Sequence, residues 1–267
     1  MMRVLVNGRE DDAIDPLDRG LLYGDGLFET IAVRDGNLRW LDWHLERLAE
    51  GANRLGFPQP EWQALRAELS AVAAGATSAV VKLILTRGLG TRGYRPPRAA
   101  QPTRIVALFP WPAARPAAAR VGWCRTRLGR NPALAGLKHL NRLEQVLARA
   151  EWDDGEQEEG LMQDESGQVI AATQANLFVR FEGGAWVTPS LAHCGVAGVM
   201  RRAFRTWSAG QGAPVVEREL TRSDVERASS LLLTNALIGA WPVQELAGRL
   251  LAIDAAAAAF NDWVERP

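Results

Sequence analysis

Lysine is almost missing from this sequence. Of its 31 lysine and arginine residues, only Lys82 and Lys138 are lysines, so the chain uses arginine wherever it needs an ordinary cation. Arginine stays protonated in proteins, whereas a lysine amine can lose its proton and act as a nucleophile or Schiff-base former. Lys138 lies in LAGLKHLNRLEQ, at the start of an expected amphipathic helix. That position fits a reactive amine, and it also fits a lysine whose charge reaches water at a helix end.

Cysteine and histidine are scarce as well. Cys124 and Cys194 are far apart in unlike contexts, and His44, His139 and His193 show no ligand spacing with them. A disulfide framework and a zinc site both need such spacing. We therefore expect no disulfides, no metal site and a reducing compartment.

Neither sign of charge is in excess, because Lys plus Arg and Asp plus Glu both number 31. A neutral chain has no overall field that would attract nucleic acid or an anionic membrane. The first residues, MMRVLVNGREDD, are acidic where a signal peptide needs an apolar core, and no apolar run is long enough to cross a bilayer. We expect a cytoplasmic protein that acts on a small molecule, with no nucleic-acid or membrane partner.

The 267 residues, 47% of them apolar, suffice for one large or two modest domains. Residues 110–119, PWPAARPAAA, combine three prolines with small residues, a composition that disfavours helix and sheet and can act as a stiff connector. We predict an N-terminal α+β domain over 1–110, a linker over 111–119 and a second mixed domain over 120–267.

Hydrophobic periodicity and turn residues predict the elements of both domains. In the first, we expect a strand at 3–7, a hairpin over 26–41, helices at 40–56 and 61–76, and strands at 80–86 and 103–109. In the second, we expect strands at 120–124, 159–164, 167–171, 176–182, 185–188, 231–236 and 243–246, and helices at 139–152, 197–210, 225–229 and 254–265. Thr221 and Asp224 have the spacing of a capping box, and Phe260 and Trp263 should dock the last helix.

Three short motifs are candidates for chemistry. GLGTRG, residues 88–93, matches a dinucleotide fingerprint, but the two prolines that soon follow forbid the helix such a site requires. It leaves a flexible loop whose Arg87 and Arg92 either clamp carboxylates or are simply solvated. CGVAGVMR, residues 194–201, places glycines before a helix and could seat a phosphate, although ordinary helix starts look similar. HLER, residues 44–47, reads by itself as a solvated helix face.

Taken together, these segments resemble the fold-type IV pyridoxal-phosphate enzymes, the group that contains branched-chain and D-amino-acid aminotransferases and 4-amino-4-deoxychorismate lyase. The resemblance is carried, in the family's order between residues 15 and 240, by DRGLLYGDGLFET, HLERL, TRGLGTRGY, RLGRNPALAGLKHLNRLEQVL, ANLF, CGVAGVMR and TNAL. LAGLKHLNRLEQ is characteristic of the lyase, so the resemblance is closest there.

The resemblance implies roles for individual residues. Lys138 would be the Schiff-base lysine, because a primary amine can condense with the cofactor aldehyde and then act as acid or base. Arg47 would bind the cofactor phosphate, together with the backbone of Val199 and Met200 and with Asn235 and Ala236. Substrate contacts would come from Arg87, Arg92, Tyr94 and Asn176.

The resemblance also implies a fold and a reaction. The fold would be α+β, with two mixed α/β domains of the D-amino-acid aminotransferase type, pyridoxal 5′-phosphate in the cleft between them, and a homodimer as the assembly. The reaction would convert 4-amino-4-deoxychorismate to 4-aminobenzoate and pyruvate. The two carboxylates of this substrate would give the arginine loop something to bind.

One position departs from the family pattern. The family has a glutamate, which pairs with the pyridine nitrogen, five residues before the Asn-Leu-Phe segment, and this sequence has Ala171 there. Thr173, Gln174 or a water could contact the nitrogen instead, and a weaker electron sink favours the lyase over transamination. The alternatives are a D-amino-acid or branched-chain aminotransferase on the same scaffold, and a catalytically weakened pyridoxal-phosphate-binding protein.

Overall fold

A computed structural model of the chain describes residues 3–10, 13–153 and 155–265. Its internal contacts divide the chain into two compact units. The first unit comprises the described residues up to Ala113 together with Leu137–Asn141, and the second comprises Ala114–Gly136 and the described residues from Arg142 onward. The segment that contains Lys138 therefore belongs to the first unit, although the sequence places it within the predicted second domain.

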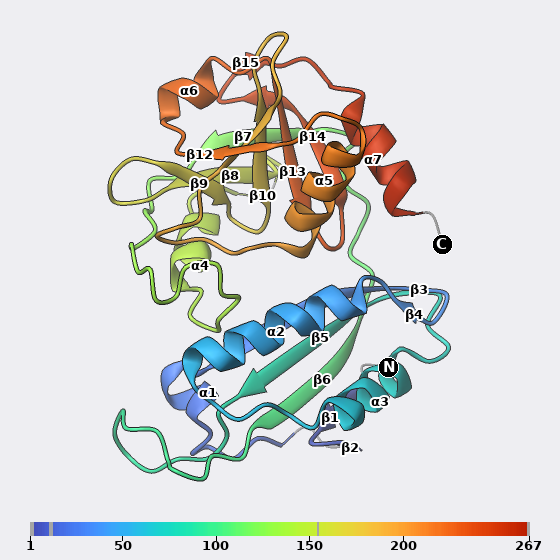
Figure 1. The fold of residues 1–267 in the computed structure, drawn as a ribbon, viewed down its shortest axis with the longest axis vertical. Helices are drawn as coiled ribbons and strands as arrows, with labels where there is room; N and C mark the ends of the chain where they lie inside the picture. Colours follow the sequence, from blue (N-terminus) through green and yellow to red (C-terminus); the bar gives the residue numbers. More distant parts are fainter. Residues whose placement is uncertain (1–2, 11–12, 154, 266–267) are drawn as a thin grey trace. The chain divides into compact units, whose positions relative to one another are not determined.

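The first unit is built on a six-stranded antiparallel sheet in the order β2-β1-β6-β5-β3-β4 (Figure 1). Its strands are β1 Val4–Val6, β2 Arg9–Glu10, β3 Gly26–Arg34, β4 Asn37–Leu38, β5 Ser78–Thr86 and β6 Thr103–Pro110. The predicted hairpin is confirmed, and both turn residues, Asp35 and Gly36, have positive φ angles of 48° and 76°. An Asp-Gly pair is favoured there because a two-residue turn of this twist requires positive φ at both positions.

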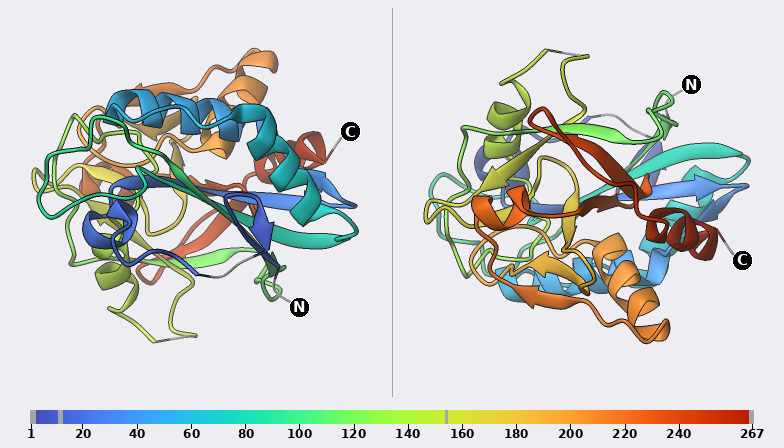
Figure 2. Two further views of the ribbon diagram at one scale, coloured as in Figure 1. Left: turned by 90° about the horizontal axis from the view of Figure 1, so that it is seen from below. Right: turned by 90° about the horizontal axis from the view of Figure 1, so that it is seen from above.

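Two helices, α2 Leu41–Leu55 and α3 Trp62–Ala73, cover one face of this sheet (Figures 1 and 2). Leu45, Leu48 and Ala52 of α2 are buried against it, as the helical spacing predicts. The Cβ of any other residue at Gly51 would come within 2.7 Å of Leu27 on β3. Glycine at this position therefore leaves room for the Leu27 side chain between α2 and β3. A short helix, α1 Arg19–Tyr23, was not predicted.

The second unit is built on a mixed nine-stranded sheet in the order β12-β11-β10-β13-β14-β7-β8-β9, with β15 paired to β14. Its strands are β7 Ala119–Trp123, β8 Glu159–Gln163, β9 Val169–Ala172, β10 Asn176–Arg180, β11 Trp186–Pro189, β12 Val216–Arg218, β13 Ser230–Asn235, β14 Gly239–Leu246 and β15 Arg249–Leu250. Helices α5 Val199–Gly210 and α7 Ala256–Val264 pack together through Phe204 and Phe260, whose ring centroids lie 5.2 Å apart. The predicted α+β class is confirmed in both units.

The bounds of two helices differ from the prediction for reasons that their contacts show. The helix expected at 139–152 is α4, and it spans only Leu143–Arg149, because residues 138–140 pair with β3 instead. The helix expected at 225–229 is α6, Arg222–Glu226, which starts earlier because the predicted capping box is present: the Thr221 hydroxyl accepts from the Asp224 N–H, and Asp224 accepts from the Thr221 N–H. None of the helices within the described ranges combines the length and apolar character that a bilayer crossing needs.

Candidate active site

Lys138 lies in an extended segment that runs beside the start of β3. The Phe28 N–H donates to the Lys138 carbonyl oxygen at 2.9 Å, and the Leu140 N–H donates to the Gly26 carbonyl oxygen at 3.0 Å. These bonds hold the backbone on both sides of the lysine's neighbour, His139, which forms a bridge with Leu27. The prediction that Lys138 lies at the start of a helix is therefore wrong. It lies in a short extended segment whose hydrogen bonds to β3 restrict its backbone.

The two lysines of the chain meet at one aromatic ring. The Lys138 Nζ lies 4.3 Å from the centroid of the Phe28 ring, and the Lys82 Nζ on β5 lies 3.6 Å from it. The two amines thus lie no farther apart than the sum of these distances. An aromatic face stabilises a nearby ammonium through its quadrupole. Both lysine amines of the first unit therefore lie next to the Phe28 ring, which stabilises their charged forms.

Arg47 forms an ion pair with Glu29 on β3. Its Nε donates to Glu29 Oε1 at 2.8 Å, and its Nη2 contacts Glu29 Oε2. His44, one helical turn earlier on α2, contacts the same Oε2 through Nδ1 at 2.6 Å. Glu29 and His44 were not predicted as site residues, although a glutamate among the inward-facing residues of GLFETIAVR is a signal that it has a buried partner.

The charges of this cluster follow from burial and pairing. Burial alone would raise the pKa of Glu29, but the Arg47 guanidinium and the His44 hydrogen bond outweigh it and lower that pKa to about 2. Burial lowers the pKa of His44, against the pull of Glu29, and the charges of Arg47 and Lys138 lower it further. Near neutral pH the cluster is thus a carboxylate, a guanidinium and a neutral imidazole that donates from Nδ1.

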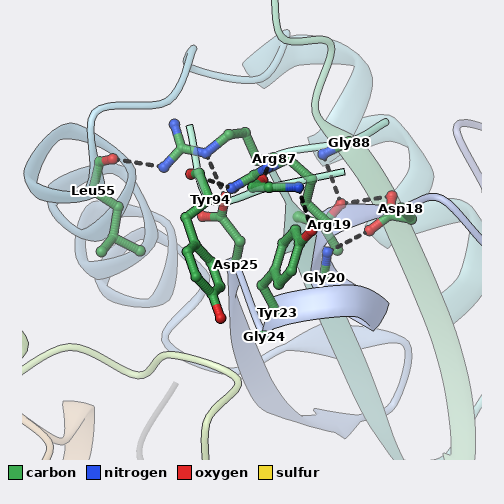
Figure 3. Close-up of polar contacts among 12 residues, drawn as sticks. Asp18, Arg19, Gly20, Tyr23, Gly24, Asp25, Leu55, Arg87, Gly88 and Tyr94 are labelled. Carbon is green, nitrogen blue, oxygen red and sulfur yellow. Dashed lines mark hydrogen bonds and ion pairs between the residues drawn. The ribbon is translucent and has the colours of Figure 1, made fainter. Parts of the chain in front are cut away.

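Arg87 is not the exposed carboxylate clamp that the sequence analysis offered. Its side chain is buried, and Nε donates to Asp25 Oδ2 at 2.7 Å and Nη2 to the Leu55 carbonyl oxygen at 2.8 Å (Figure 3). Nη1 donates to the Gly56 carbonyl oxygen at 3.0 Å. Arg19 donates to the same Asp25 oxygen at 2.9 Å. A guanidinium engaged on three sides holds the end of α2 and the strand β5 together.

The loop that follows Arg87 is anchored at its tip. Arg19 donates to the carbonyl oxygens of Gly93 and Tyr94 at 3.1 and 3.0 Å, and the Tyr23 hydroxyl accepts from the Gly93 N–H at 3.0 Å. The rings of Tyr23 and Tyr94 pack edge to face with centroids 5.4 Å apart (Figure 3). Arg92 and Tyr94 remain exposed, Tyr94 by 85%. Of the predicted substrate residues on this loop, these two are accessible to a ligand.

In the second unit, the predicted phosphate-binding residues lie around the start of α5. Gly198 is the N-cap, and Val199 and Met200 open the helix, whose first N–H groups have no partner within the helix. Asn176 donates from Nδ2 to the Val196 carbonyl oxygen at 2.8 Å, and its Oδ1 fills the space that a Cβ at position 198 would need. Glycine and Asn176 together therefore shape this turn.

Asn235 is the last residue of β13, the strand next to β10, and Ala236 follows it. β13 pairs with β10 so that Asn176 lies opposite Thr234. The side chain of Asn235 accepts from the Leu237 N–H at 3.0 Å and donates to the Gln174 carbonyl oxygen at 3.2 Å. The second unit thus brings its predicted cofactor-binding residues together with Asn176.

Ala171 lies on β9 opposite Met162, and it packs against a cluster that includes Cys124. The nearby Thr173 is engaged elsewhere, because its hydroxyl donates to Glu159 Oε2 at 2.6 Å and its N–H donates to the same oxygen at 3.1 Å. Burial raises the pKa of Glu159, although these hydrogen bonds oppose the shift. Glu159 was not predicted, and a charged residue opening the apolar strand EGLMQ was its only signal.

Both cysteines of the chain are buried. Cys124 and Cys194 are free, buried thiols, and burial raises their pKa values to about 12 and about 11, so both are protonated at neutral pH. Among the residues that the structure describes, no group of three or more His, Cys, Asp or Glu is placed to hold a metal ion.

Several known proteins are similar to this chain. The family model Amino-transferase class IV matches residues 26–246. An aminodeoxychorismate lyase of Vibrio harveyi is 36% identical over 248 residues, which are 89% of each chain. The crystal structure of 4-amino-4-deoxychorismate lyase from Pseudomonas aeruginosa is 44% identical with a TM-score of 0.93, covering 98% of this chain and 97% of that one. A putative branched-chain-amino-acid aminotransferase of Methanocaldococcus jannaschii is 28% identical, covering 94% of this chain and 90% of that protein.

Proposed function

Because this chain belongs to the class IV aminotransferase family, whose members use pyridoxal phosphate, we propose that it converts 4-amino-4-deoxychorismate to 4-aminobenzoate and pyruvate. The observation that supports this proposal most is similarity over nearly the whole chain to two lyases, higher than the similarity to the aminotransferase. A D-amino-acid or branched-chain aminotransferase and a weakened cofactor-binding protein are the alternatives.

The residues present fit most of the cofactor. Lys138 supplies a primary amine on a backbone held by β3, and Arg47 supplies a guanidinium that is 12% exposed at the surface of the first unit. In the second unit, the first N–H groups of α5, which have no partner within the helix, are suited to an anion. The poor match is at the pyridine nitrogen, where Ala171 offers no carboxylate. When bound, the cofactor withdraws electrons from the carbon that bears the substrate amine.

The chain's own residues then carry out binding and proton transfer. We assign to the Lys138 Nζ the removal of the proton from the amine-bearing carbon of the substrate. The C–O bond to the enolpyruvyl group breaks as the ring becomes aromatic, and the released enolpyruvate takes up a proton to become pyruvate. The stability of the aromatic product helps to drive the step. Arg92 is assigned to a substrate carboxylate, because it is exposed on the loop that Arg19 anchors.

Incubation of the purified protein with aminodeoxychorismate tests the proposal. A lyase releases 4-aminobenzoate and pyruvate without any keto acid, and the Lys138→Ala variant releases neither. An aminotransferase instead moves the substrate's amino group to a keto acid, so consumption of aminodeoxychorismate that depends on a keto acid and yields its amino acid without 4-aminobenzoate would contradict the proposal. Cofactor binding with no turnover under either condition would support the weakened binding protein.

We further propose that the chain forms a homodimer. On α4, Leu143, Val146 and Leu147 are exposed by 76%, 59% and 61%, at a spacing that puts them on one helix face. An exposed apolar stripe of this kind is typical of a surface that another protein covers. Light scattering should give about twice the mass of 29.2 kDa, and Leu147→Glu should lower it. A monomeric unmodified protein would exclude the dimer.

A further inference from the structure

We infer that Glu29 and His44 are positioning residues for Arg47, which hold its guanidinium in one plane for the phosphate of the cofactor. The inference rests on the proposed cofactor role of Arg47. Neither Glu29 nor His44 is assigned a contact with the cofactor itself.

The first support is the geometry of the ion pair. Glu29 accepts from two adjacent nitrogens of Arg47, Nε at 2.8 Å and Nη2 through the other carboxylate oxygen. A guanidinium held at two nitrogens by one carboxylate cannot rotate about the Cδ–Nε bond without losing both contacts. The direction in which Nη1 points is then fixed as well. Arginine held in this way is better prepared for a second planar or tetrahedral anion than a freely rotating one.

The second support is the placement of His44. It precedes Arg47 by three residues on α2, so both side chains leave the same helix face and reach the same carboxylate. The Nδ1 hydrogen bond of 2.6 Å to Glu29 Oε2 prevents the carboxylate from turning away. Burial keeps the imidazole neutral by lowering its pKa. The cluster therefore gains a hydrogen-bond donor for Glu29 without a second positive charge.

The third support is a gradient of burial. The side chains of Glu29 and His44 are each 1% exposed, whereas the Arg47 side chain is 12% exposed. The carboxylate and imidazole thus lie beneath the guanidinium, which alone reaches the surface. His44 Nε2 is buried without a hydrogen-bond partner in the described part of the chain, so the contact of Nδ1 with Glu29 is what orients the imidazole.

A purely structural role is the rival explanation, because a buried ion pair also joins α2 to β3. The chain offers a matched control in the same unit. Arg104 and Glu68 form a similar two-nitrogen pair with side chains that are 18% and 9% exposed, and it joins α3 to β6. Glu68→Gln should lower the melting temperature much as Glu29→Gln does. Only Glu29→Gln should affect how the protein distinguishes a phosphorylated cofactor.

The experiment measures equilibrium binding of pyridoxal 5′-phosphate and of pyridoxal, which lacks the phosphate, to apoprotein prepared from each variant. Arg47→Met defines the full loss of phosphate preference. Glu29→Gln should lose about tenfold of that preference, the scale of one charge-assisted hydrogen bond. His44→Leu should lose part of it, and His44→Asn, whose amide can donate from nearly the same place as Nδ1, should restore it.

Unchanged preference in Glu29→Gln and His44→Leu, or tighter phosphate binding after removal of the competing carboxylate, would overturn the inference. Unchanged preference in Arg47→Met would overturn both the assignment of Arg47 and the inference. The readout does not depend on turnover, so absence of 4-aminobenzoate formation would count against the proposed function alone.

Discussion

At the scale of single residues, the distance to Phe28 does not decide which of the two lysines forms the bond to the cofactor. Both amines lie close to its ring, but Lys82 is in the middle of β5 and Lys138 is in a segment outside the regular sheet. A lysine that exchanges its bond to a cofactor for a bond between cofactor and substrate must be able to move its side chain while its backbone stays in place. Lys138, anchored through its carbonyl oxygen to β3, meets this requirement.

We therefore predict that borohydride reduction of the protein with bound pyridoxal phosphate labels Lys138 and not Lys82. Peptide mapping locates the label. Lys138→Ala should abolish the visible absorbance of the bound cofactor, whereas Lys82→Met should retain it. Label on the peptide that contains Lys82 would contradict the assignment.

Ala171 carries the second prediction at this scale. A carboxylate beside the pyridine nitrogen keeps it protonated, and a protonated ring withdraws electrons more strongly. Transamination depends on that withdrawal more than an elimination that ends in an aromatic ring. We expect Ala171→Glu to raise the rate at which simple D- or L-amino acids convert the cofactor to its pyridoxamine form, followed by stopped-flow absorbance. Rapid conversion by the unmodified protein would contradict the argument.

At the scale of elements, the two arginines at and after the end of β5 have different roles, because Arg92 is exposed and Arg87 is buried. Arg92 should bind a substrate carboxylate. Arg92→Met should therefore lower kcat/KM, by an amount that corresponds to a loss of about 1.5–3 kcal/mol of transition-state stabilisation, with cofactor content unchanged. Arg87→Met should instead lower the free energy of unfolding, because Asp25 and two carbonyl oxygens lose a buried partner. Urea unfolding and steady-state kinetics of both variants separate the two effects.

The contact between β3 and α2 should make stability depend on pH. The pKa of Glu29 falls from 4.5 to about 2 in the folded protein. Its ionised form therefore stabilises the fold above pH 4.5, and this contribution is lost as the pH falls toward 2. Glu29→Gln should unfold more easily at pH 7 and should lose less stability on acidification than the unmodified protein. Urea unfolding between pH 3 and 7 measures the difference, and parallel curves would refute the prediction.

At the scale of the whole molecule, local sequence patterns were enough for the elements that depend on neighbours. The Asp35-Gly36 hairpin and the Thr221 capping box depend on residues at most three apart, and many strands are short apolar runs that can be recognised from their own residues. The resemblance carried by LAGLKHLNRLEQ drew attention to Lys138 because the motif is contiguous. These features could be read from the sequence because their physical causes are themselves local.

The sequence by itself thus determined the α+β class and most of the elements, and it indicated Lys138 as the candidate for covalent chemistry. Only the tertiary structure decided what depends on distant partners. Lys138 is extended because its backbone pairs with β3. Arg87 and Arg92 look alike in the sequence, but one is buried against Asp25 and the other is exposed. No periodicity predicts such pairing, because the energy of a charge or a backbone hydrogen bond depends on which remote group is folded against it.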